Sequence, residues 1–161
     1  MEYNGKVKLI VYNGKMKKET IMDELILRYN LSDSVKWHSN DLIEVNIKTG
    51  SPGNYSLFYS VDMDKVSKKH NFPLAIDANN NIILIGTEEV YVTNIFDGKT
   101  KYILNLDFAN SAIKWLIFER ENTYFDQEGH LNLKYTNSAG KWVEEKIKKE
   151  SWKIFNRLGL D

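Results

Sequence analysis

The chain contains no cysteine among its 161 residues. This absence excludes disulfides, thiolate metal sites and cysteine nucleophiles, and it favours a reducing, cytoplasmic compartment. No stretch approaches the roughly 18 consecutive apolar residues that a membrane-spanning helix needs, and the amino-terminal residues lack a signal-peptide pattern. We therefore expect a cytoplasmic protein without a membrane partner, in which residues 1–161 form a single domain around one core.

An excess of charge of either sign is also missing, because 22 basic residues balance 22 acidic ones. Without net charge the chain lacks the long-range field that draws proteins to nucleic acid, so no nucleic-acid partner is expected. The charges are nevertheless unevenly spread, and the interval from Glu88 to Glu128 holds eight acidic residues against four basic ones. We interpret this interval either as ordinary solvated surface or as an acidic docking surface.

The sequence motifs of nucleotide-binding and hydrolytic enzymes are missing as well. The glycines form neither Gly-x-Gly-x-x-Gly nor Gly-x-x-x-x-Gly-Lys, and no serine lies in a Gly-x-Ser-x-Gly elbow. His38, His70 and His130 are too scattered for a helical ligand pair, so each is expected to be a solvated surface imidazole. Asp62 and Asp64 could bind a divalent cation, but helix capping explains them better. We expect no catalytic residue, no metal and no cofactor.

Alternating apolar residues and turn signals predict a mainly antiparallel sheet of about six strands. The predicted strands are an opening strand over 6–12, a hairpin of 42–47 with 55–61, a meander of about four strands over 74–106, and an edge hairpin of 124–125 with 131–135.

Three further segments have apolar residues at helical spacing. They are residues 20–29, residues 110–120, which are ambiguous between helix and strand, and the segment from Val143 to Leu158. Three helices packed on the sheet would make an α+β fold. Neither a linker nor a repeat of fixed period divides the chain.

Aromatic residues are plentiful, and core packing is the first explanation for most of them. Trp37 has the most polar surroundings, so we expect it to be partly exposed and able to anchor a partner. Combined with the acidic interval, it gives a predicted partner-binding set of Trp37, Glu88, Glu89, Asp97, Glu119 and Glu121.

Three pieces of sequence between residues 71 and 118 resemble the later part of the SUKH superfamily. Residues 72–85 (FPLAIDANNNIILI) resemble its proline-led strand, turn and apolar strand, and residues 89–92 (EVYV) resemble the start of its next hairpin. Residues 106–116 (LDFANSAIKWL) resemble its closing strand and capped helix. Members of this family are immunity proteins that protect bacteria against nuclease and other toxin domains, and the family has no catalytic residues.

The resemblance implies an immunity-type inhibitor, without enzyme activity, that binds and neutralises a cognate toxin domain. Charge matching would speed capture of the toxin, and buried aromatic residues would hold it. One alternative is a regulatory or scaffolding module that binds a protein on a sheet edge or on the carboxy-terminal helix. Another is a small enzyme with a carboxylate pair distant in sequence, which a pocket with two carboxylates of raised pKa would favour.

Overall fold

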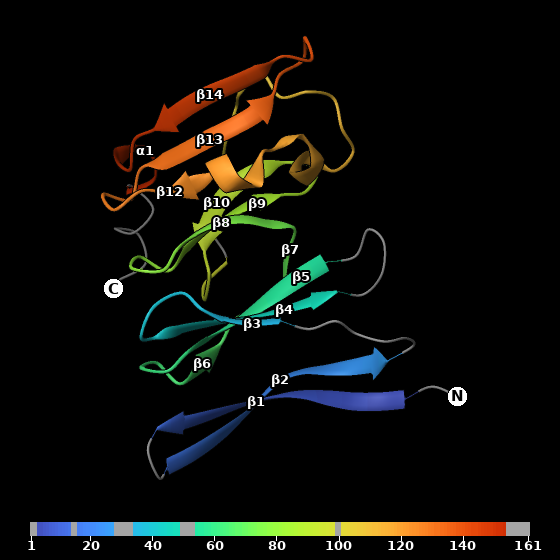
Figure 1. Ribbon diagram of the computed structural model, residues 1–161, viewed down its shortest axis with the longest axis vertical. Coiled ribbons are helices and arrows are strands. Elements are labelled where there is room, and N and C mark those ends of the chain that lie inside the picture. Colours follow the sequence, from blue (N-terminus) through green and yellow to red (C-terminus); the bar gives the residue numbers. More distant parts are fainter. Residues whose placement is uncertain (1–2, 14–15, 28–33, 49–53, 99–100, 154–161) are drawn as a thin grey trace.

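In the computed structural model, the described residues 3–13, 16–27, 34–48, 54–98 and 101–153 form four antiparallel sheets stacked in chain order (Figure 1). The first sheet consists of β1 (Tyr3–Asn13) and β2 (Met16–Leu27). The second consists of β3 (Ser34–Trp37), β4 (Leu42–Lys48), β5 (Asn54–Ser60) and β6 (Lys65–Val66), with β7 (His70–Asn71) also paired to β5.

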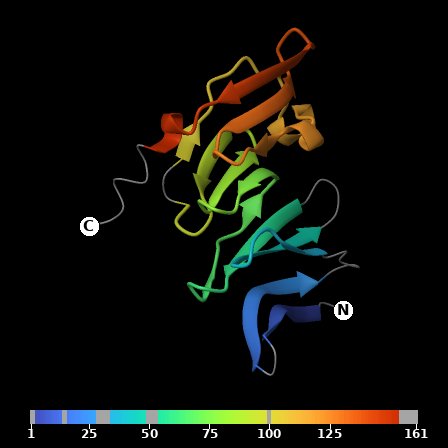
Figure 2. The same cartoon turned by 60° about the vertical axis from the view of Figure 1, so that its left-hand side comes forward.

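The third sheet is the meander of β8 (Pro73–Asp77), β9 (Ile82–Gly86), β10 (Val90–Asn94) and β11 (Lys101–Ile103). The fourth consists of β12 (Tyr124–Phe125), β13 (Leu131–Thr136) and β14 (Trp142–Ile147). Two 3-10 turns, η1 (Lys114–Ile117) and η2 (Arg120–Asn122), connect these two sheets, and α1 (Glu150–Lys153) follows β14. Figure 2 shows the same order of sheets from a second direction.

The middle sheets of the stack are buried on both faces. On β9, Ile83 and Ile85 pack toward the second sheet, with Leu42 and Phe58, whereas Leu84 packs toward the fourth sheet. Side chains alternate between the two faces of a strand, so a strand covered on both faces has apolar residues at every position. This explains why residues 82–85 form an unbroken apolar run.

The chain passes from the second sheet to the third at Phe72, which has a positive φ of 52°. Asn71, immediately before it, pairs with Tyr55 of β5, and Pro73, immediately after it, begins β8. A left-handed conformation is rare for a bulky residue and reverses the direction of an extended chain. Phe72 therefore marks the point where one sheet ends and the next begins.

His70 is buried between these two sheets, so the prediction of a solvated imidazole is wrong for this residue. Its Nε2 donates to the Ile95 carbonyl at 2.8 Å, and its ring packs edge-on against Phe58. Burial lowers the pKa of His70 below its ordinary value of 6.5, and the charge of Lys68 adds to this effect, while the hydrogen bond to Ile95 opposes it.

This lowered pKa predicts a loss of stability in mild acid. The folded state binds fewer protons than the unfolded state, so the free energy of unfolding should fall as pH decreases from 6.5 toward the lower folded pKa. His70→Gln, which keeps a side-chain donor, should lose this part of the pH dependence in urea titrations between pH 7.5 and 5.5. A matched His130→Gln variant should keep it, and equal slopes in the two variants would contradict the assignment.

The predicted α+β fold, a sheet of about six strands with three helices packed on it, is wrong, because the strands form four antiparallel sheets and α1 is the only α-helix among the described residues. Residues 20–27 belong to β2, which pairs with β1 along its length. Residues 110–120 contain η1, and the extended Phe118 that follows pairs with Tyr135. The predicted carboxy-terminal helix begins as β14, while residues 154–161 lie outside the described part of the chain.

Most of the predicted strands are confirmed. The opening strand is β1, the hairpin is β4 with β5, the meander is the third sheet, and the edge hairpin is β12 with β13. Within the described ranges, no helix is long and apolar enough to cross a membrane.

Candidate functional site

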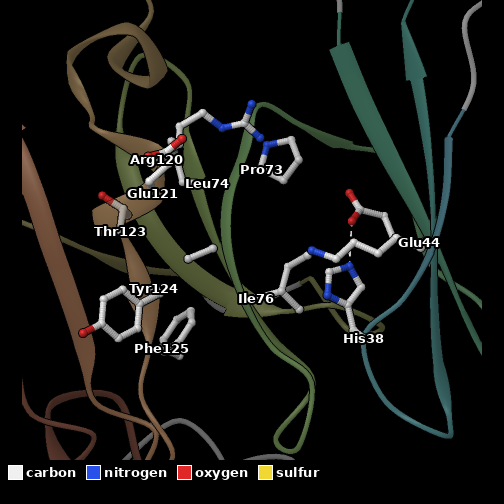
Figure 3. A pocket seen from close by; sticks show the side chains of 12 residues that line it. His38, Glu44, Pro73, Leu74, Ile76, Arg120, Glu121, Thr123, Tyr124 and Phe125 are labelled. Atoms are coloured by element: carbon white, nitrogen blue, oxygen red, sulfur yellow. Dashed lines mark hydrogen bonds and ion pairs between the residues drawn. The ribbon is translucent and has the colours of Figure 1, made fainter.

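Three sheets meet around a cavity of about 580 Å³ (Figure 3). The second sheet contributes Lys36, His38 and Glu44, β8 contributes residues 73–76, and the segment from η2 to β12 contributes residues 120–125 except Asn122. Each of β3, β8 and β12 is the edge strand of its sheet. The cavity therefore lies where the edges of three sheets converge, and concave sites of this kind are where ligands and partner groups bind.

A polar network forms the wall of the cavity on the second sheet. His38 Nε2 lies 2.7 Å from Glu44 Oε2, and both side chains are only 12% exposed. The hydroxyl of Ser56 donates to Glu44 Oε1 at 2.5 Å and accepts a hydrogen bond from Asn46 Nδ2 at 3.0 Å. Glu44 thus has a partner on each oxygen, as a buried carboxylate requires.

The network determines the charge state of Glu44. Burial alone would raise the pKa of its carboxyl, but the hydrogen bonds from His38 and Ser56, together with the charges of His38 and Lys36, outweigh burial. The pKa of Glu44 therefore lies below its ordinary value of 4.5. Glu44 is an anion at neutral pH.

Replacing Glu44 by glutamine should lower the free energy of unfolding by about 1–3 kcal/mol at pH 7, because the amide cannot accept from both partners. A depressed carboxyl pKa stabilises the fold above the unfolded value and loses that effect as pH falls through the folded value. The difference between Glu44→Gln and the parent chain should therefore shrink below about pH 4.5. Urea titrations at pH 7 and pH 3.5 measure it, and a constant difference would contradict the assigned charge state.

The order of groups in this network differs from that of a hydrolase triad. A serine nucleophile needs a histidine beside it and the carboxylate behind the histidine. Here the carboxylate of Glu44 lies between Ser56 and His38, and Ser56 is completely buried. A small enzyme would use a pair of carboxylates with raised pKa. Glu44 and Glu121 both line the cavity, but they do not form such a pair, because the pKa of Glu44 is lowered.

Two exposed cationic side chains line the cavity. Lys36 and Arg120 both line it, and neither forms an ion pair within 4.0 Å among the residues that the structure describes. The Arg120 guanidinium lies 5.2 Å from the centre of the Trp115 ring. Figure 3 shows its side chain extending as far as Pro73, in the direction of the sheet that carries Glu44. Both cations are therefore available to an incoming anionic group.

The edge strand β3 presents apolar side chains to solvent on the face opposite the cavity. Val35 is 58% exposed and Trp37 is 53% exposed, although Val45 and Ile43, their cross-strand partners, are buried. Within the described residues, β3 pairs only with β4. A strand with one free edge carries backbone groups that can pair with another chain.

The structure separates the predicted partner-binding residues. Trp37 lies on β3 and is partly exposed, as expected. Glu88 and Glu89 precede β10, whereas Asp97 follows it, so these residues lie at opposite ends of that strand. Glu121 lines the cavity with Lys36 and His38.

Glu119, the remaining residue of the set, forms an ion pair with Lys134 at 2.6 Å and accepts from Asn122. The Lys134 side chain also lies 3.6 Å from Glu144. The six residues therefore do not form one continuous acidic patch.

Glu44 and Arg120 were not among the site residues predicted from the sequence. A signal for the buried network exists, because the polar residues Glu44 and Asn46 alternate with apolar ones on β4, and Ser56 lies on β5. No sequence rule pairs Arg120 with Lys36, because their proximity results from the packing of different sheets.

Among the described residues no group of three or more histidine or acidic side chains is arranged to hold a metal ion. Comparison with family models, with curated proteins and with solved structures found no match for this chain.

Proposed function

We propose that the chain is a cytoplasmic, non-catalytic immunity-type inhibitor that binds its protein partner at the free edge of β3. The observation that carries the proposal is the exposure of Val35 and Trp37 on a strand whose second edge has no partner in the described chain. A protein that binds an extended segment at such an edge gains main-chain hydrogen bonds, and adjacent side chains provide selectivity. Tryptophan is among the residues that contribute most to binding when buried in an interface.

The other edge strand with an exposed tryptophan is less suited to this role. Trp142 on β14 is 58% exposed, but the neighbouring residues facing solvent are charged. Lys146 forms an ion pair with Asp126 at 2.8 Å, and Glu144 lies near Lys134. Charged side chains along an edge discourage strand addition, so β14 has the features of a protected edge.

The toxin as partner is supported by the SUKH resemblance, whereas the binding mode is supported by β3. The catalytic alternative lacks support in the cavity, because the pKa of Glu44 is depressed and the completely buried Ser56 hydroxyl donates to Glu44 rather than to a histidine. The regulatory or scaffolding alternative would use the same edge with a different partner.

Co-expression with the toxin domain encoded beside its gene tests the proposal. The chain should restore growth, and Trp37→Ala should weaken the purified complex at least about tenfold, since an anchoring tryptophan is worth about 2 kcal/mol or more. Trp142→Ala, a matched exposed tryptophan on an edge strand, should retain both rescue and affinity. Continued killing of cells that contain the folded chain would contradict the toxin partner, and equal effects of the two substitutions would contradict the β3 contact.

A further inference from the structure

Resting on the proposed function, we infer that β3 receives a β-strand with acidic residues on its cavity side and apolar residues on its other side. The two faces of β3 differ sharply in chemistry. Lys36 and His38 line the cavity, whereas Val35 and Trp37 lie on the opposite face. Side chains of an added strand lie beside those of β3 on the same face, so the partner must alternate in the same way.

The charges around the cavity favour an acidic residue over a basic one on the cavity side of the added strand. Lys36 and Arg120 are exposed cations without an ion pair among the described residues, while Glu44 is already bound to His38 and Ser56. Glu121 is the one other acidic residue on the lining, so the exposed charges there sum to one positive charge. A carboxylate between Lys36 and Arg120 would gain charge-assisted hydrogen bonds, and an ammonium group would be repelled.

The dimensions of the cavity are compatible with a strand that pairs with β3 and places a carboxylate side chain in the cavity. Adjacent strands lie about 4.8 Å apart, so a strand added to β3 would place its side chains at the cavity opening. A cavity of about 580 Å³ is larger than one carboxylate side chain needs. Figure 3 shows the Arg120 side chain extending to Pro73, on the side of the cavity that faces the second sheet.

The other two edges at the cavity are poorer receptors for a strand. β8 is largely buried and begins with Pro73, which has no amide hydrogen to donate. β12 has only two residues, Tyr124 and Phe125. Of the edges that converge there, β3 alone combines length, exposure and an apolar outer face.

Two synthetic peptides test the inference directly. One alternates valine with glutamate over eight residues and the other alternates valine with lysine, and each is titrated into the full chain at low salt. The glutamate peptide should bind at least about tenfold more tightly, and this preference should decline in 1 M NaCl because salt screens exposed charges. Equal affinities, or a preference for the lysine peptide, would overturn the inference.

Charge reversal provides the matched control. The double variant Lys36→Glu and Arg120→Glu should bind the lysine peptide more tightly than the glutamate peptide, whereas Lys141→Glu, an exposed lysine just before β14, should leave the original preference unchanged. Lys36→Glu places an anion opposite Glu44 and should cost some stability, so urea titration is used to confirm that each variant is folded before binding is measured. An unchanged preference in the double variant would overturn the inference.

The outcomes for the inference and for the proposed function can be told apart. Failure of both peptides to bind, together with rescue of cells that depends on Trp37, would overturn the inferred strand chemistry and leave the immunity function supported. Charge-selective peptide binding without rescue would support the strand chemistry and contradict the toxin as partner.

Discussion

Replacing Phe58 by alanine is expected to lower the free energy of unfolding by about 3–5 kcal/mol. Phe58 is completely buried between the second and third sheets, where it packs with Leu42, Ile83 and Ile85. Its ring also contacts His70, with ring centres 5.7 Å apart. The alanine variant would leave a cavity between the second and third sheets. Close-packed sheets cannot collapse to fill such a cavity.

Urea titration at pH 7 measures this effect. Leu116→Ala, at a side chain that is 65% exposed, is the control, and it should change the free energy of unfolding by less than about 0.5 kcal/mol. Similar midpoints for the two variants would mean that the second and third sheets do not pack face to face.

Gly86→Ala should lower the free energy of unfolding by about 1–3 kcal/mol, because even one added methyl group overpacks the end of β9. A Cβ atom at this position would lie 2.7 Å from Leu74 Cδ1 and 3.0 Å from the backbone nitrogen of Trp115. The Leu74 side chain can move, but the Trp115 backbone is held by the adjacent Lys114 amide, which donates to the Thr87 carbonyl at 2.7 Å.

The same urea titration, with Glu88→Ala as an exposed neighbouring control, tests this contact. The control should remain within about 0.5 kcal/mol of the parent chain. A Gly86→Ala variant as stable as the control would show that η1 does not lie against the end of β9.

The strands of the third sheet and the β12–β13 hairpin could be predicted from local sequence because turn chemistry and strand pattern agree there. Asp77 Oδ1 accepts the amides of Asn79 and Asn80 at the turn before β9. Asp126 Oδ1 accepts the amides of Glu128 and His130 at the corresponding turn before β13. Such side-chain acceptors stabilise turns locally, so the signal does not depend on the rest of the fold.

The helices were predicted wrongly because tertiary pairing overrides helical spacing. Val143 and Ile147 have the spacing of a helix face, yet they lie on β14 with Glu145 between them on the same side of the strand. Glu145 can face inward because its carboxylate accepts a hydrogen bond from the Tyr135 hydroxyl at 3.1 Å. A polar residue with a specific partner thus conceals the alternation that would have identified a strand.

The cavity could not be predicted for a different reason. Lys36, Glu44 and Arg120 belong to different strands and turns, and only the stacking order of the sheets brings them together. Local sequence predicts which side chains lie on each face of a strand, but it does not predict which sheet packs against that face. The prediction that His38 is a solvated surface imidazole is also wrong, because its side chain is only 12% exposed and pairs with Glu44.

Hydrogen–deuterium exchange of the chain, alone and mixed with the toxin domain proposed as its partner, is the closest test of strand addition at β3. Amides of Ser34–Trp37 that are not already bonded to β4 should become slow to exchange in the complex, while those of β14 should be unchanged. Unchanged exchange along β3, with new protection on β14 or between Glu88 and Asp97, would contradict strand addition at β3.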